Sequence, residues 1–371
     1  MVWIDSVQNP FRQLTLPLAL ESPALMMSIL SVAAGDLWTR SHSLLDSATN
    51  VSQPWDKYQK KALGHLADHL KDENKLGQET DINAYPGTDL ASPILAAFLL
   101  GSLAIKLGNS TVWRLHLRAA WTMLEHWHAC PSRWSLSVDA VKEFLWQEVY
   151  CSRVWESVTT FKPLQGLDGN DHDFEHEAPF FRYAGIIRRM AEMERQTAAN
   201  AALVSDMISI TSLEIELDTA RQRTRKCGES LTFPSARARI AFDCVVELFH
   251  HAGLLYASHV LSQDDLSTSV ADRSRSLLFM PLQSIEVTDI IAQDLTWPIF
   301  IAGTECHGCC ERQNLVRERM IQVMQLSGVL ERPRLLEFLQ TFWQLQSQDP
   351  QASWISLARV WAECGEPILI I

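Results

Sequence analysis

The stretch from Asp294 to Trp343 constrains the fold more than any other part of this sequence. It begins with Trp297-Pro298, and proline is favoured in the first turn of a helix because its missing N–H needs no partner there. Residues Ile299–Ala302 are apolar on every side, which is typical of a helix buried all round. Apolar residues then recur at helical spacing on both sides of Ser327-Gly328, a typical helix stop. The stretch predicts a buried helix followed by two amphipathic helices.

The same helical spacing continues through most of the chain. Ser22-Pro23 is a typical helix start, with serine as the N-cap and proline at the first position. Helices are expected at residues 23–39, 54–71, 88–107, 110–130, 135–160, 180–206, 211–226, 234–261 and 353–363. Residues 1–20 are expected to form a leading segment with a turn at Asn9-Pro10. Residues 71–87 are expected to form an exposed loop, and 262–269 a polar linker before short helices.

Strand-like alternation is nearly absent, apart from the apolar tail at residues 367–371. No internal repeat of about 33–45 residues is visible, which disfavours a regular solenoid. We therefore predict an all-α fold: a single large domain spanning residues 1–371, with ten or more packed helices.

Composition and charge restrict the class of function. Hydrophobic residues make up 47% of the 371 residues and charged residues 20%, which is typical of a globular core-forming chain. The net charge of −12 disfavours direct binding of nucleic acid, since that binding depends on Lys and Arg neutralising phosphates. Eight cysteines form no regular framework, which indicates reduced thiols. No apolar run approaches the ~18 residues of a membrane span, and the N-terminus does not resemble a signal peptide.

Residues 161–179 interrupt the helical pattern with an acidic cluster that contains His172 and His176. If this segment were helical, the two histidines would share a face and could bind a metal or work with the carboxylates as an acid–base pair. Gly169 and Pro179 enclose the cluster, and so polar a stretch is typical of a solvated loop. We favour the loop and keep His172 and His176 as the candidate catalytic residues.

Cys306, His307, Cys309 and Cys310 form the second candidate site. Thiolate and imidazole ligands suit zinc, which takes four of them in a tetrahedron. On a helix, however, Cys306 and Cys310 would share a face while His307 pointed elsewhere, and no second pair of ligands is evident. We therefore favour cysteines that pack in the core, and expect neither a metal nor a cofactor.

Three further features allow a structural and a functional interpretation. The compact basic run at Arg221–Lys226 is either a solvated helix end or a localisation signal or anion patch. His250-His251 lies within an apolar helix, where hydrogen-bonded core histidines are the favoured interpretation. Five tryptophans are expected to be core residues rather than a ligand cage, although an aromatic interior also suits a small apolar ligand. They are Trp113, Trp121, Trp127, Trp146 and Trp155.

Several stretches, in this order, resemble one known family. They are Asn9–Arg12 with Leu16–Leu18, Ser22–Leu25 with Ser31–Ala34, Leu95–Leu103 with Trp113–Leu117, Phe249–Tyr256, and Trp297–Gly303 with Phe342-Trp343. Together they resemble the fungal-specific transcription factor domain, the helical middle and C-terminal region of fungal zinc-cluster regulators. The resemblance covers about residues 3–365.

The resemblance implies a nuclear regulatory domain that supports dimerisation, autoinhibition or effector sensing, and it implies no catalytic residues. The family's six-cysteine DNA-binding module is not found in these 371 residues. The chain is then either part of a longer regulator or a free-standing member of the family. The expected partners are other proteins or a second copy, together with a small apolar ligand, without direct contact to nucleic acid or membrane.

The alternative function is that of an enzyme or helper in fungal secondary metabolism, acting on an apolar substrate and located in the cytoplasm. Against the commonest enzyme classes, the sequence contains no GxSxG, P-loop, GxGxxG or HExxH motif.

Overall fold

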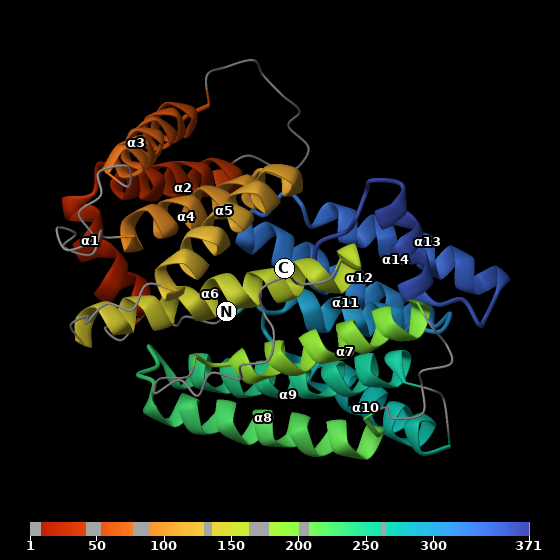
Figure 1. Cartoon of the computed structure of the whole chain (residues 1–371). Coiled ribbons are helices and arrows are strands. Elements are labelled where there is room, and N and C mark those ends of the chain that lie inside the picture. Colours follow the sequence, from red (N-terminus) through yellow and green to blue (C-terminus); the bar gives the residue numbers. More distant parts are fainter. Residues whose placement is uncertain are drawn as a thin grey trace. The chain divides into compact units, whose positions relative to one another are not determined.

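The computed structural model describes residues 9–41, 53–76, 90–129, 136–162, 178–199, 208–261 and 265–370 (Figure 1). Within these ranges all regular elements are helices, and no strand is present. They are a π-helical segment, η1 (Phe11–Thr15), followed by α1 (Leu16–Glu21), α2 (Pro23–Ser41), α3 (Asp56–Leu76), α4 (Ala91–Lys106), α5 (Ser110–Ala129), α6 (Leu136–Thr160), α7 (Phe181–Ala199), α8 (Ile210–Ser230), α9 (Ala236–Val260), α10 (Asp265–Ser284), α11 (Thr296–Thr304), α12 (Cys310–Ser327), α13 (Pro333–Gln348) and α14 (Trp354–Glu363). The predicted all-α fold of ten or more helices is confirmed.

Three local predictions were wrong. The leading segment is helical from Pro10 to Glu21 because Asn9 Oδ1 accepts a hydrogen bond from the backbone N–H of Phe11 at 2.9 Å, as a capping residue does. The exposed loop expected at residues 71–87 is wrong for its first part, since α3 continues to Leu76; residues 77–87 lie outside the described residues. Residues 262–264 also lie outside them, but from Asp265 the linker expected at 262–269 and the short helices expected after it are instead the single helix α10, whose buried side packs on α9. In α10, tertiary packing outweighs the polar character of the first turn.

The chain divides into two compact units. The N-terminal unit comprises Val7–Tyr150 and Gly328–Glu331, and the C-terminal unit includes Cys151–Ser327 and Arg332–Ile371. In the N-terminal unit, α2 packs against α3 and α4, and α4 packs against α5. The single domain predicted for residues 1–371 stays a prediction.

Lys106, at the end of α4, organises one corner of the N-terminal unit. Its buried ammonium pairs with Asp36, and its backbone carbonyl accepts a hydrogen bond from the N–H of Leu330 at 2.9 Å. Burial acts to raise the pKa of Asp36, but the hydrogen bond and charge of Lys106 outweigh it and lower that pKa below its ordinary value. This contact fixes the segment after Gly328, which ends α12 with a φ of 62°.

The C-terminal unit is built around α9. Figure 1 shows α7, α8 and α9 side by side, and α10 and α11 also pack against α9. In length and composition α9 could span a membrane, but 78% of its most apolar window is buried inside the protein, as in a core helix. This packing places side chains of α8, α9 and α10 around shared cavities.

The stretch that begins at Asp294 has the predicted structure. All nine residues of α11 are buried, and Trp343 of α13 donates its indole N–H to the carbonyl of Gly303 at 2.8 Å. A Cβ at Gly303 would lie 2.6 Å from a methyl carbon of Leu339, so glycine permits this close approach of α13. The buried helix and the two amphipathic helices after it are confirmed.

The tryptophans expected in the core are mostly there. Trp113, Trp121 and Trp127 are at most 4% exposed. Trp146 and Trp155 are half-buried, and each packs against another indole at a centroid distance of 4.9 Å (Trp146 with Trp121) or 5.3 Å (Trp155 with Trp297).

The apolar tail is also anchored, because Thr159 Oγ1 donates to the carbonyl of Ile368 at 2.6 Å.

Candidate functional site

The two sets of residues singled out in the sequence have different outcomes. His172 and His176 lie outside the described residues. The segment Cys306–Cys309 is a tight turn between α11 and α12, and the N–H of Cys309 donates to the carbonyl of Cys306 at 2.9 Å. His307 and Gly308 both have positive φ, 46° and 75°, as the central residues of a type I′ turn do. The helical geometry considered for this segment was therefore wrong.

The turn separates the four candidate metal ligands. Cys306 is fully buried, its thiol donates to the carbonyl of Ala302, and burial raises the pKa of this thiol to about 12. Cys309 lies 3.2 Å from the Glu311 carboxylate, and Cys310 is exposed. Across the described part of the chain, no group of three or more His, Cys, Asp or Glu side chains is arranged to hold a metal ion.

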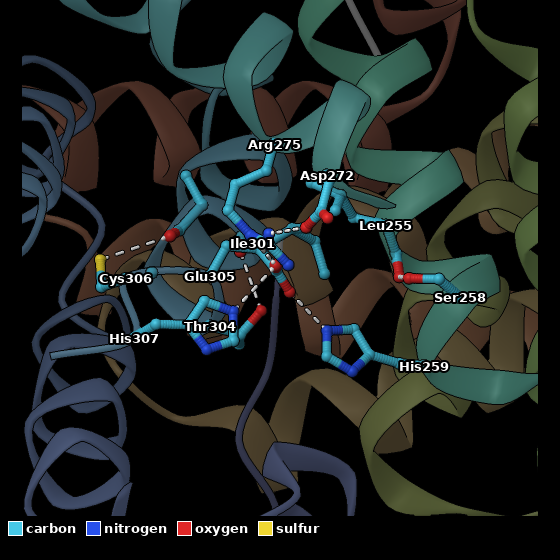
Figure 2. Close-up of polar contacts among 12 residues, drawn as sticks. Leu255, Ser258, His259, Asp272, Arg275, Ile301, Thr304, Glu305, Cys306 and His307 are labelled. Atoms are coloured by element: carbon cyan, nitrogen blue, oxygen red, sulfur yellow. Dashed lines mark hydrogen bonds and ion pairs between the residues drawn. The ribbon is translucent and has the colours of Figure 1, made fainter. Parts of the chain in front are cut away.

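His307, the fourth candidate, belongs to a cluster of charged groups around a buried carboxylate. No sequence pattern predicts this cluster. Glu305 follows the last residue of α11 and is only 1% exposed. Its carboxylate lies 2.5 Å from Nε2 of His259, accepts a hydrogen bond from Nε of Arg275 at 2.8 Å, and lies 3.3 Å from Nε2 of His307. Figure 2 shows these side chains converging on the carboxylate, and we call the four residues the Glu305 cluster.

The electrostatics of the Glu305 cluster are those of a satisfied buried charge. Burial acts to raise the pKa of Glu305, but hydrogen bonds from His259 and His307 and the charge of Arg275 hold it well below its ordinary value. Burial acts to lower the pKa of Arg275, and the Glu305 carboxylate reverses this and raises it. Arg275 also donates to Asp272 at 2.6 Å. The cluster thus joins α9, α10 and the turn after α11.

A pocket of about 400 Å³ lies beside the N-terminal half of α9. We call it the apolar pocket, and its apolar lining residues are Ala238, Ile240, Ala241, Cys244, Ile285 and Ile290, with Ser235, Arg237, Ser284, Glu286 and Thr288 as the polar ones. An ion pair between Arg237 and Glu286 lies at its edge. Burial, together with the charges of Asp243 and Glu247, raises the pKa of the Cys244 thiol, which keeps that thiol protonated. The lining is therefore suited to binding an apolar molecule rather than to nucleophilic chemistry.

A second pocket, of about 230 Å³, lies where α8, α9 and α10 meet. We call it the histidine pocket, and its polar lining residues are Glu214, Asp218, Arg221, His250, His251 and Arg273. His250 and His251 are buried as expected, and Nδ1 of each ring has no hydrogen-bond partner. In the basic run, Arg221 and Arg225 pair with Glu247 of α9, at 3.4 and 2.8 Å.

Comparison with known proteins gives one match. The family model described as the fungal specific transcription factor domain matches residues 1–371, the whole chain. The chain belongs to this family. Searches of the curated proteins and of the solved structures returned no match.

Membership of the fungal specific transcription factor domain family confirms the resemblance carried by the helical stretches of the sequence. It supports a transcription-regulator-like role for the chain. The two pockets and the Glu305 cluster are features of this chain that no local motif marks. Their residues come from successive helices and the segments after them, tens of residues apart, and only an apolar helix with internal histidines indicated one of them.

Proposed function

We propose that this chain is the regulatory domain of a nuclear transcription regulator, and that a small apolar effector in the apolar pocket controls its contacts with partner proteins. The family match over residues 1–371 carries the proposal. The domain contacts another protein or a second copy of itself, and direct contact with DNA is left to a different module, in keeping with the net charge of −12.

A reporter assay tests the regulatory role. The chain is fused to an unrelated DNA-binding module and expressed in a fungal cell that carries a matching reporter gene. We expect the fusion to change reporter transcription relative to the DNA-binding module alone, and a fluorescent fusion to accumulate in the nucleus. A well-expressed, folded fusion that leaves transcription unchanged, or a purely cytoplasmic distribution, would contradict the proposal.

The apolar pocket has dimensions that suit an effector. Its volume of about 400 Å³ lies within the ~300–1,000 Å³ that is usual for pockets that bind small molecules. Ile240 lines the pocket and yet is 64% exposed, so it lies at the mouth. Ile215 of α8 has the same exposure outside the pocket and provides a matched control position.

Binding of the neutral fluorescent amine N-phenyl-1-naphthylamine tests the pocket directly. We expect saturable binding to the wild-type chain, a clear loss of affinity in Ile240→Glu, and unchanged affinity in Ile215→Glu. The charge at position 240 must be desolvated when an apolar ligand enters, whereas the charge at position 215 stays in water. Equal effects of the two substitutions would place the binding site elsewhere.

Oligomeric state tests the protein contacts. Light scattering on the purified chain distinguishes the 42.0 kDa monomer from a dimer of twice that mass. A dimer whose dissociation changes on addition of the apolar probe supports effector control. If the chain is a monomer both with and without the probe, it acts instead through contact with a different protein. Co-purification with the reporter-active fusion then identifies that protein.

A further inference from the structure

The histidine pocket contains buried polar atoms that the protein leaves without partners. His250 is 5% exposed and His251 is 7% exposed, and Nδ1 of each ring has no hydrogen-bond partner. The two rings contact each other edge to face, with centroids 5.0 Å apart. Buried polar side-chain atoms in folded proteins nearly always have a partner, and here two unpartnered atoms belong to adjacent rings that line the same pocket.

The protonation of His250 determines what its free atom offers. Burial, with a smaller contribution from Arg221, lowers the pKa of His250, and the ring is neutral at pH 7. The backbone of Leu217 acts in the opposite direction, since it raises this pKa. A neutral imidazole carries one ring proton, on either nitrogen. In the tautomer with the proton on Nε2, Nδ1 of His250 presents a lone pair and accepts from a hydrogen-bond donor.

His251 is also neutral. Burial, followed by the neighbouring His250, lowers the pKa of His251 to about 3. Its Nδ1 can donate or accept, according to which nitrogen carries the proton. The pair thus supplies two adaptable groups, and each Nδ1 accepts from a ligand donor when the ring proton is on Nε2.

The charged side chains of the histidine pocket add both acceptors and a donor. Glu214 pairs with Arg273, and Asp218 pairs with Arg221 and Gln222, but a carboxylate can accept up to four hydrogen bonds. The donor is Nε–H of Arg221, which is buried and has no acceptor. The pocket accordingly offers several acceptors for a cation. For an anion it offers one unpaired N–H, on the guanidinium of Arg221.

Geometry excludes the most compact occupant of such a site. A metal ion needs ligand atoms at about 2.0–2.2 Å, and no trio of His, Cys, Asp or Glu in the described residues is arranged in that way. Hydrogen bonds from an ammonium group span about 2.7–2.9 Å and fit a wider ring of acceptors. The volume of about 230 Å³ is below the ~300 Å³ at which pockets for drug-sized ligands begin, so the occupant is small.

We propose that the histidine pocket binds a small zwitterion of the α-amino acid class. Its ammonium donates to Nδ1 of His250 and to the carboxylates of Glu214 and Asp218. Its carboxylate accepts from Nε of Arg221. This site is distinct from the apolar pocket and does not depend on the proposed regulatory function, because binding is measured on the purified chain.

Nuclear magnetic resonance of the histidine rings tests the proposal. The chain is labelled with ¹³C in its histidine rings, and the signals of His250 and His251 are assigned by their loss in single His→Phe variants. Glycine is the probe, while methylammonium and acetate represent its two halves. We expect glycine to shift both signals saturably, and each half to bind at least about tenfold more weakly, since each loses one set of charge-assisted hydrogen bonds.

A pair of substitutions in α8 controls for indirect effects. Glu214→Gln keeps the shape of the side chain but removes a charged acceptor, and should weaken glycine binding about tenfold. Glu229→Gln lies on the same helix at an exposed position outside the pocket and should leave binding unchanged. Equal thermal midpoints of the variants establish that both are folded.

Three results would overturn the proposal. The first is the absence of a saturable shift of either signal with glycine. The second is binding of acetate or methylammonium as tight as that of glycine, which would show a simple ion site. The third is an equal loss of glycine binding in Glu214→Gln and Glu229→Gln.

Discussion

The Glu305 cluster and the histidine pocket both bring histidines and charged side chains together against α9. They differ in whether their buried polar atoms have hydrogen-bond partners. The Glu305 carboxylate lies within hydrogen-bond distance of His259, Arg275 and His307. In the histidine pocket, Nδ1 of His250, Nδ1 of His251 and Nε of Arg221 have no partner. A buried polar group that has its hydrogen bonds costs the fold little, whereas an unsatisfied one costs stability unless a ligand completes it. We infer that the Glu305 cluster has a structural role and that the histidine pocket binds a ligand.

Removing the charge of Glu305 should have the largest effect. Glu305→Gln leaves Arg275 half-buried beside a neutral amide and should lower the free energy of unfolding by about 3 kcal/mol or more. Urea unfolding of the two proteins measures the difference. Glu318→Gln, an exposed position on α12, is the control and should change stability little. Similar midpoints for all three proteins would show that the cluster contributes nothing to the fold.

The next effect concerns pH and distinguishes the two regions. The folded-state pKa of His251 is lowered to about 3, while the unfolded value is about 6.5. Below pH 6.5, His251 therefore binds a proton in the unfolded chain but not in the folded chain. Stability is complete above pH 6.5 and falls with decreasing pH by about 1.4 kcal/mol per unit. At pH 5.0 the loss attributable to His251 is about 2 kcal/mol.

The variant His251→Phe isolates this contribution. Its urea midpoint should fall less than that of the wild type between pH 7.5 and pH 5.0. Glu305 should not contribute in that interval. Its pKa is depressed in the folded state, so its stabilisation is present above the unfolded value of about 4.3 and is lost only below it. Parallel pH profiles of wild type and His251→Phe would contradict the assignment.

The smallest effect concerns the turn that carries His307 to the Glu305 cluster. Gly308 has a φ of 75° and open space around it, so Gly308→Ala tests backbone strain alone, at a cost of about 1 kcal/mol. Gly64, in the middle of α3, also has open space but no positive φ. Gly64→Ala should raise stability by up to about 1 kcal/mol, and thermal unfolding compares the two. The same sign for both substitutions would show that the turn is not strained.

The elements of the fold could be predicted because they depend on local pattern. The apolar run after Trp297-Pro298 and the stop at Ser327-Gly328 predict α11 and α12 to within a few residues. The failures have local causes as well. Asn9-Pro10 is a helix start of the same kind as Ser22-Pro23, although the Asn-Pro pair by itself is also typical of a turn. The polar first turn of α10 hid a helix that packing on α9 stabilises.

The sites could not be predicted, because their residues meet only in three dimensions. His259 and Arg275 precede Glu305 by 46 and 30 residues, and no spacing rule connects them. The sequence predicts that His250 and His251 are buried, since they lie in an apolar helix. It cannot predict that their Nδ1 atoms lack partners, because this depends on where α8 and α10 lie against α9.

The histidine ring signals during addition of glycine test the central contrast most directly. We expect the signals of His250 and His251 to shift saturably, while those of His259 and His307 in the Glu305 cluster stay in place. Unmoved signals of His250 and His251, or an equal shift of all four, would contradict the difference between the two regions.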